Sequence, residues 1–349
     1  MYNAKAMELY HIYFYDTIRL LKLLEKGDYM IQFGIDLGAN SLRLINEDEI
    51  LFNEPCAIAV DKSNHTLAIG KEALEIKKSK DDAIQILWPI TSNHINFDAL
   101  DALLEQLCYQ FKVFKKFHKT TILLSYPTSL NEDRCNTLKQ HLIDLGANRV
   151  YSDCEIWFSA IGAGLNITLP ITHCVMNIGS SNCDIATFAN GRIQNKFDFS
   201  LAGNQVMLAI QRYLKYEKHI SVNYTTLDTI QRTIGCVQVQ PIPRTIEIFG
   251  TNTNTKEETS IIISENDLVP ILSPLVKQWV QWISKFLQQL NPEQKEDILR
   301  QGIIACGGTM KLKGIQQEFF HRLKIPFYIT DQPTETVCKG MQILLSNMH

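Results

Sequence analysis

Two short motifs in the sequence carry residue types suited to binding phosphate. One runs from Phe33 to Gly38 and ends in Asp-Leu-Gly, and the other runs from Val175 to Gly179 and ends in Asn-Ile-Gly. Each reads as a strand that enters a polar turn, and a glycine-containing turn leaves backbone N–H groups to face phosphate oxygens. Asp36, in the first motif, could hold a hydrated Mg²⁺ beside them. The alternative is two ordinary hairpins with glycine turns.

The segment from Phe111 to Lys119 alternates aromatic and basic residues. The rings of Phe111, Phe114 and Phe117 could enter a bilayer interface while each nearby lysine adds about 1 kcal/mol of attraction to anionic headgroups. The alternative is a helix end whose phenylalanines pack inward and whose lysines are solvated. The segment is therefore a candidate membrane contact.

The composition is that of an ordinary globular protein. The chain has 349 residues, of which 45% are hydrophobic and 20% charged, and this length is enough for about two domains. The net charge of −3 disfavours nucleic acid as a partner. The nine cysteines include no C-x-x-C pair, which indicates buried thiols in a reducing cytosol rather than a zinc or redox site.

Hydrophobic periodicity predicts an α/β chain after an N-terminal extension, residues 1–30. We expect helices at 98–111, 131–145, 155–164, 204–217, 225–234, 272–290, 310–322 and 334–346. We expect strands at 31–37, 42–46, 50–52, 57–60, 66–69, 121–126, 173–178, 183–189, 192–199, 302–306 and 327–330. The polar segment 250–259 is expected to be a loop.

The first motif, with its continuation Ala39-Asn40-Ser41-Leu42 and the later Asn53-Glu54-Pro55, resembles the opening of the MreB family, the bacterial actins that determine rod shape. Ile161-Gly162-Ala163-Gly164-Leu165 is similar to a further segment of that family, and the order is collinear over roughly residues 31–346. The resemblance implies an actin-like fold, with two large domains around a nucleotide cleft. The implied domains are 31–168, with a small subdomain at about 56–88, and 169–349, with a small subdomain at about 205–290 and a last helix that returns toward the first domain.

The resemblance also implies a site for ATP and Mg²⁺. The implied nucleotide-binding residues are Asp36, Gly38, Ala39 and Asn40; Asn177, Gly179, Ser180, Ser181 and Asn182; Asn223, Tyr224, Thr225 and Thr226 near the base; and Gly307, Gly308, Thr309 and Met310 in a third turn. Asp36 and Asn177 would hold the metal through water. Glu155 aligns with the family residue that positions the attacking water; the alternative is a solvated acid at a helix start.

Several departures from the family pattern predict weak nucleotide binding. A threonine is missing after Gly38, Asn177 stands in place of an aspartate, and Ser180 and Ser181 stand in place of glycines. Tyr224 also replaces an acid. If either serine must adopt a positive φ, it costs about 1 kcal/mol. We therefore expect at most a slow ATPase that is coupled to polymerisation.

The function implied by the resemblance is that of a filament protein. It would be cytoplasmic, peripheral on the inner face of the plasma membrane, and would determine cell shape and guide cell-wall synthesis. Its implied partners are further copies of itself as a homopolymer, a regular MreB-like paralogue and membrane proteins of cell-wall elongation, with no nucleic acid. The alternatives are a nucleotide-binding-impaired pseudo-ATPase partner of another filament protein, or a small-molecule kinase of the same fold, although we find no sugar-binding loop.

Overall fold

The computed structural model describes residues 30–76, 83–91, 95–116 and 118–348. The predicted N-terminal extension lies outside these residues except for Met30, which begins the first strand. The described residues form two compact units. Unit 1 holds those up to Pro170, Phe188–Ile193 and those from Glu335 on, and unit 2 holds Ile171–Thr187 and Gln194–Thr334.

Unit 1 is built on a five-stranded sheet in the order β3-β2-β1-β7-β8. The strands are β1 (Met30–Leu37), β2 (Leu42–Ile45), β3 (Ile50–Glu54), β7 (Lys119–Tyr126) and β8 (Arg149–Cys154). Strands β1, β2 and β3 form an antiparallel meander, whereas β7 is parallel to both β1 and β8. Nearly every side chain of β7 is buried, as expected of a central strand in a covered sheet.

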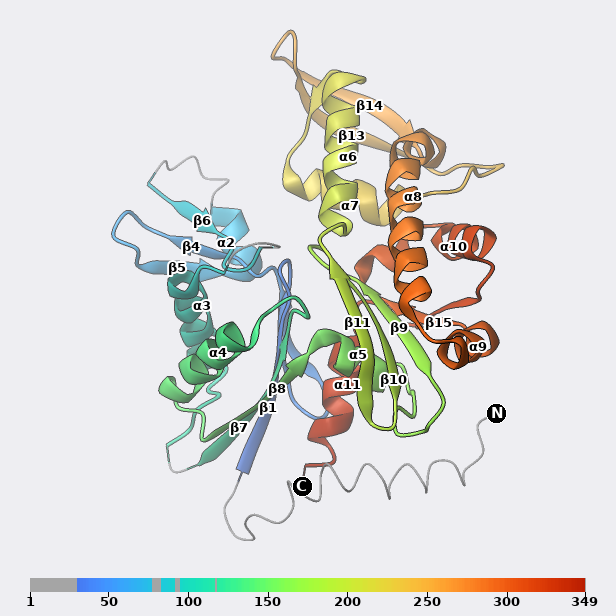
Figure 1. Ribbon diagram of the computed structural model, residues 1–349. Coiled ribbons are helices and arrows are strands. Elements are labelled where there is room, and N and C mark those ends of the chain that lie inside the picture. Colours follow the sequence, from blue (N-terminus) through green and yellow to red (C-terminus); the bar gives the residue numbers. More distant parts are fainter. Residues whose placement is uncertain (1–29, 77–82, 92–94, 117, 349) are drawn as a thin grey trace. The chain divides into compact units, whose positions relative to one another are not determined.

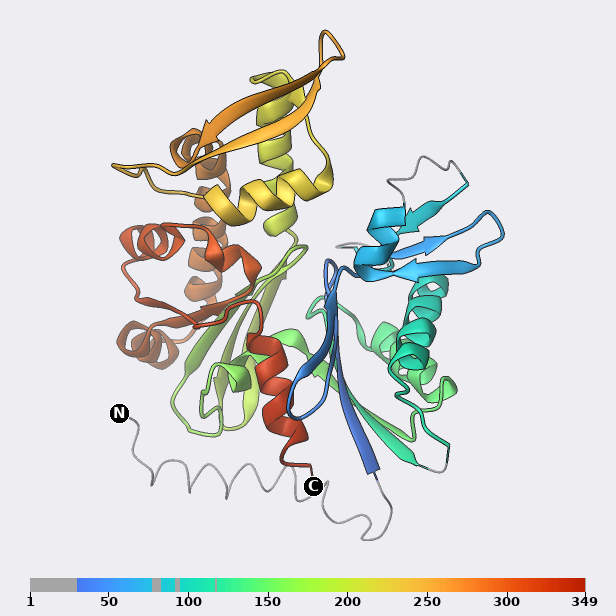
Figure 2. The same cartoon turned by 180° about the vertical axis from the view of Figure 1, so that it is seen from behind.

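The helices of unit 1 are α3 (Phe97–Gln110), α4 (Glu132–Asp144), α5 (Glu155–Gly162) and α11 (Thr336–Leu345). Helix α3 forms because leucines recur at helical spacing on one buried face, and Asn96 caps its start by accepting a hydrogen bond from Ala99 N. Helices α5 and α11 lie side by side (Figures 1 and 2), and α11 also contacts β1. A smaller sheet has the strand order β5 (Thr66–Ile69), β4 (Ile58–Val60) and β6 (Gln85–Leu87). Helix α2 (Gly70–Ile76) lies between β5 and β6 along the chain.

Unit 2 repeats the same strand order in its own five-stranded sheet, β11-β10-β9-β15-β16. The strands are β9 (His173–Ile178), β10 (Cys183–Ala189), β11 (Arg192–Phe199), β15 (Ile303–Cys306) and β16 (Phe327–Ile329). The main helices are α6 (Gly203–Tyr216), α8 (Glu265–Gln289), α9 (Pro292–Gln301) and α10 (Ile315–Leu323), with a 3₁₀ turn η2 (Gly308–Lys311). The two phosphate-type motifs therefore end equivalent strands, β1 and β9.

A three-stranded sheet, β12 (Ile220–Ser221), β13 (Thr245–Asn252) and β14 (Glu258–Ser264), and helix α7 (Tyr224–Ile234) complete unit 2. The expected loop 250–259 is shorter than predicted, because its ends belong to the paired strands β13 and β14. Helix α8 begins one to two turns earlier than expected, at a Ser264–Asp267 capping box, and contains Pro270 and Pro274. Burial of its apolar face, centred on the fully buried Trp279, outweighs the helix-breaking tendency of these prolines.

Candidate functional site

The first candidate element is the turn between β1 and β2 in unit 1. Gly38 N donates to Ser41 O at 3.0 Å and closes the turn. A Cβ atom at Gly38 would lie 2.8 Å from Ser41 O, so a side chain there would force the turn open. Ala39 and Asn40 form the tip of this turn, and most residues of the turn have small side chains. The turn can therefore bring its backbone close to a bound group.

Asp36, the carboxylate expected to hold the metal, is paired with an arginine. The register places Asp36 directly opposite Arg43 on β2, and Arg43 opposite Asn53 on β3. Arg43 Nη1 lies 2.7 Å from Asp36 Oδ2, and Arg43 Nε donates to Asn53 Oδ1 at 3.1 Å. Both charged side chains are largely buried, with 13% of Arg43 and 4% of Asp36 exposed. The ion pair is thus buried, and the hydrogen bond to Asn53 helps to hold the arginine in place.

These residues do not fit a hydrated Mg²⁺ as the family pattern implies. The metal needs anionic oxygens, and Asp36 already shares its carboxylate with the Arg43 guanidinium. Burial alone would lower the pKa of Arg43, but Asp36 and Glu335 raise it above its usual value, so the guanidinium stays charged. Asn177 carries no charge to compensate. The expected Mg²⁺ site is therefore not supported by the residues present.

Three turns of unit 2 come together at the end of β9. Gly203 N donates to Gly179 O at 3.0 Å, and Asn204 N donates to Ser180 O at 2.7 Å, which joins the start of α6 to the turn after β9. Asn204 Nδ2 also donates to Ser181 Oγ at 3.1 Å. This turn, with Asn182 at its end, is thus held against the N-terminus of α6 by hydrogen bonds that use the first N–H groups of that helix.

The third turn reaches the same place. Thr309 Oγ1 donates to Gly179 O at 2.9 Å, and a Cβ at Gly203 would lie 3.0 Å from that hydroxyl oxygen. Gly307 has a φ of 93°, and a Cβ there would lie 2.5 Å from Asn177 Oδ1. Only glycine fits so close an approach. The structure therefore brings Asn177, Gly179–Asn182 and Gly307–Thr309 together in a cradle that small residues make possible.

Other predicted site residues have local structural roles. Neither Ser180 nor Ser181 adopts a positive φ, so loss of the family's glycines causes no backbone strain there. The side chain of Met310 belongs to the core of unit 2. Asn223 Oδ1 accepts hydrogen bonds from Thr226 N at 2.8 Å and Thr225 Oγ1 at 2.7 Å, so this segment caps α7. The 39% exposed Tyr224 begins that helix.

Glu155 lies at the carboxyl end of the sheet in unit 1. Ser125 on β7 lies opposite both Asp36 on β1 and Asp153 on β8, and these three strands are parallel. Glu155 follows Asp153 by two residues and is the first residue of α5. Glu155 and Asp36 are therefore at the same end of this sheet, where ligands bind in parallel α/β sheets.

The described phenylalanines of the candidate membrane segment pack inward. Phe111 and Phe114 both contact the core of unit 1, and Phe111 lies edge-on to Phe52 with ring centroids 5.8 Å apart. The ring of Phe114 lies against Gly146, where an added Cβ would be 3.2 Å away. Insertion of these two rings into a bilayer would remove them from the core, and Phe117 lies outside the described residues. No helix in the described part of the chain is both long and apolar enough to cross a bilayer.

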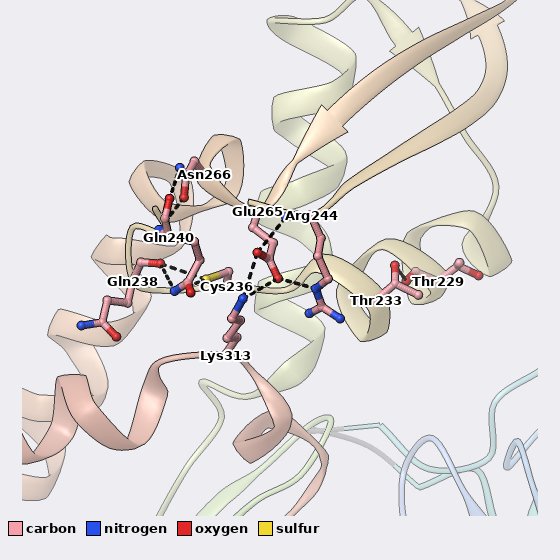
Figure 3. Close-up of polar contacts among 9 residues, drawn as sticks. All are labelled: Thr229, Thr233, Cys236, Gln238, Gln240, Arg244, Glu265, Asn266 and Lys313. Carbon is pink, nitrogen blue, oxygen red and sulfur yellow. Dashed lines mark hydrogen bonds and ion pairs between the residues drawn. The ribbon is translucent and has the colours of Figure 1, made fainter. Parts of the chain in front are cut away.

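A polar cluster in unit 2 was not predicted from the sequence (Figure 3). Glu265, the first residue of α8, is fully buried, and its carboxylate accepts hydrogen bonds from Arg244 N at 3.0 Å and Arg244 Nε at 2.6 Å. Lys313 Nζ lies 3.0 and 3.2 Å from the two carboxylate oxygens. An acid in a first helical turn is common, and only the fold shows that three distant segments meet on it.

The neighbouring amides extend this cluster along one segment of unit 2. Asn266 Oδ1 accepts from Gln240 N at 2.8 Å, and Gln240 Nε2 donates to Gln238 O at 2.8 Å. Cys236 Sγ lies 3.0 Å from Gln238 O (Figure 3). These contacts fix the connection from α7 to β13 against the start of α8. The cluster is therefore a structural tie, and its groups are committed to one another.

Comparison with known proteins places the whole described chain in one family. A model of the family described as MreB/Mbl protein matches residues 30–349. The cell shape-determining protein Mbl of Bacillus subtilis (strain 168) is 29% identical over 318 residues, which are 90% of this chain and 96% of the relative. The cell shape-determining protein MreB of Escherichia coli (strain K12) is 21% identical over 323 residues, 90% of this chain and 93% of the relative.

Solved structures agree with this assignment. The crystal structure of MreB5 of Spiroplasma citri bound to ADP has a TM-score of 0.85 and 25% identity, and covers 91% of this chain and 96% of that one. The MamK double helical filament has a TM-score of 0.76 at 15% identity over 91% of this chain and 99% of that one, which shows the fold alone. The expected actin-like fold is therefore confirmed.

Proposed function

The chain belongs to the MreB/Mbl family, and on that basis we propose that it is a cytoskeletal protein that determines cell shape by forming filaments on the inner face of the plasma membrane. The observation that carries the proposal is the extent of the family match, residues 30–349, which includes both hairpins and α11. The Mbl and MreB relatives are named as cell shape-determining. Guidance of cell-wall synthesis, with wall-elongation membrane proteins and a regular paralogue as partners, belongs to the same proposal.

Electron microscopy of the purified full-length chain on an anionic lipid monolayer, with ATP, tests this proposal. We expect straight, paired filaments, because opposite ends of an actin-like subunit present complementary surfaces that do not close into a ring. A sample without lipid serves as the control for membrane association. A protein that stays monomeric at high concentration, with lipid and with each of ATP, ADP and AMPPNP, would contradict the filament proposal. That outcome would favour the pseudo-ATPase partner of another filament protein.

Nucleotide binding by the cradle of unit 2 is part of the proposal. The MreB5 relative was crystallised with ADP and with AMPPNP. In this chain the turn at Gly179–Asn182 lies at the N-terminal, positive end of α6, which favours phosphate oxygens. The hydroxyls of Ser180 and Ser181 add further donors. Because fixed negative charge for a metal is missing at Asn177, we expect ATP to bind weakly and to be hydrolysed slowly.

Replacement of Glu155 by alanine is expected to reduce phosphate release from ATP by about ten- to a hundredfold and to leave ATP binding unchanged. The carboxylate at the start of α5 is the group proposed to orient the water and accept its proton, a role that contributes on the order of 10²-fold. Phosphate release and calorimetric ATP binding measure the two effects separately.

The matched control for Glu155 is Glu132→Ala, which removes an exposed acid from the first turn of α4. Both variants remove one carboxylate from a helix start, so any general effect of helix destabilisation appears in both. Equal phosphate release from the wild type and from the Glu155 variant would contradict the assigned role of this residue.

A further inference from the structure

We propose that copies of this chain bind one another through two exposed apolar surfaces of unit 2, with the loop 238–243 of one copy docked on the outer face of the β13–β14 hairpin of another. The inference deepens the proposed filament function and rests on it. Four large apolar side chains carry it, and each is at least 69% exposed: Val239, Ile242, Phe249 and Ile262. All four lie between α7 and α8 along the chain. Exposed apolar side chains gathered in this way mark an interaction surface.

The loop 238–243 is fixed on both sides of its tip by paired hydrogen bonds. Gln240 N donates to Asn266 Oδ1 at 2.8 Å, and Asn266 Nδ2 donates to Gln240 O at 2.9 Å (Figure 3). Directly after the loop, Arg244 N donates to Glu265 Oε2 at 3.0 Å, and Glu265 N donates to Arg244 O at 3.0 Å. Glu265 and Asn266 are the first two residues of α8, so one helix end holds the loop on both sides.

Val239 and Ile242 form an apolar knob on this loop. Ile242 is 88% exposed and stands between Pro241 and Pro243, whose rings fix the backbone φ. The connection from α7 to β13, which carries the knob, projects from the rest of unit 2 in both views (Figures 1 and 2). Because the backbone of the loop is already ordered, docking of the knob costs little further conformational entropy. The knob is therefore suited to bind an apolar surface of a partner.

The β13–β14 hairpin supplies the second surface, because one of its faces is packed and the other is exposed. Ile248 and Ile263 belong to the core of unit 2, and side chains alternate between the two faces along a strand. Phe249 and Ile262 therefore lie on the outer face, where each is 69% exposed. Ile262 lies opposite Glu247, two residues before Phe249, so the two apolar side chains are diagonal neighbours on that face.

The charges beside the two surfaces are opposite in sign. Glu247 and Glu258 lie on the same outer face as Phe249 and are exposed. At the loop, the side chains of Arg244 and Lys313 are 61% and 40% exposed and share the single carboxylate of Glu265, which leaves positive charge in excess. A basic apolar knob complements an acidic apolar face. Because each copy carries both surfaces, a second copy of this chain is the partner that they fit.

Oxidative cross-linking of full-length variants tests the contact. Ile242→Cys and Ile262→Cys each place a thiol on one of the two surfaces, whereas the nine native cysteines are buried. With copper phenanthroline as the oxidant, we expect a disulfide-linked dimer in an equimolar mixture of the two variants and little dimer from either variant alone. The matched control replaces Ile242→Cys in the mixture by Leu299→Cys, which puts a thiol at a 56% exposed position on α9 and should give little dimer.

Serine substitutions measure the strength of the same contact by analytical ultracentrifugation. Ile242→Ser and Ile262→Ser should each weaken self-association by about ten- to a hundredfold, since each removes one buried apolar side chain. An equimolar mixture of the two should recover part of it, because an intact knob can still meet an intact face. Leu299→Ser should associate as the wild type does.

Two results would overturn the inference, and they differ in what they imply for the proposed function. If the mixed cysteine variants give no more dimer than the Leu299→Cys control while the wild type forms filaments in electron microscopy, the inference fails and the filament function stands. If the wild type stays monomeric at every concentration, the inference and the filament proposal are both overturned.

Discussion

Replacement of Gly340 by alanine is expected to lower the free energy of unfolding of unit 1 by about 3–5 kcal/mol, the upper range for single substitutions. Gly340 lies where α11 crosses α5, and a Cβ atom there would be 2.0 Å from Phe158 O. A Cβ on the facing Gly162 would be 1.8 Å from Thr336 O. Both obstacles are backbone atoms of packed helices, so the helices must separate to admit even one methyl group.

Urea denaturation followed by circular dichroism gives the free energy, and hydrogen exchange shows whether α11 is the element released. Gly164→Ala is the matched control, because its Cβ would meet nothing within 4 Å but its φ is 76°. That variant should cost only about 1–2 kcal/mol of backbone strain. A loss at Gly340 no larger than that at Gly164 would contradict the close crossing of the two helices.

Replacement of Glu265 by glutamine is expected to destabilise unit 2 by about 3 kcal/mol. The carboxylate is fully buried and binds both Arg244 and Lys313, and the neutral amide would leave these cations without their counter-charge. Glu296→Gln breaks an exposed pair with Arg300 in the same unit and should cost less than about 0.5 kcal/mol. Urea unfolding of both variants at neutral pH makes the comparison, and equal losses would contradict the stabilising role of the buried carboxylate.

The same carboxylate gives unit 2 a dependence on pH. Burial by itself would raise the pKa of Glu265, but the hydrogen bonds from Arg244 and Lys313 leave it below its ordinary value. In acid the unfolded chain therefore binds a proton at Glu265 before the folded one does. The stabilisation is complete above about pH 4.3, where an unfolded glutamate titrates, and is lost as the pH falls through the lower value of the folded state. Glu265→Gln should show a shallower loss of stability in acid.

Local patterns in the sequence predicted most elements correctly. The bounds of β9, β10 and β11 agree with the expected strands, because alternating or continuous apolar runs between turn residues define strands by themselves. Asn291-Pro292, which follows the expected helix 272–290, also begins a helix that was not expected, because Asn291 caps the start of α9. The residues of the cradle in unit 2 were predicted from resemblance, and their mutual contacts came only from the fold.

The missed residues have in common that their roles depend on partners that lie on other strands or helices. Arg43 reads as one charge in an apolar strand, and only the antiparallel register shows that it faces Asp36 and Asn53. Glu265 likewise needs Lys313, which is 48 residues away. Sequence periodicity gives the face on which a side chain lies, but not the residue on the neighbouring element that it meets.

The crossing of α5 and α11 also sets an order of events during synthesis of the chain. Unit 1 contains both α5 and α11. After α5 has been made, the ribosome must translate residues 171–334 before it reaches α11. At about 5–20 residues per second this takes on the order of ten to thirty seconds. During that interval the surface of α5 around Gly162 and the face of β1 that α11 covers have no α11 to pack against. Unit 2 is therefore synthesised before unit 1 is complete. The nascent chain therefore exposes apolar surface for long enough to be a substrate for chaperones.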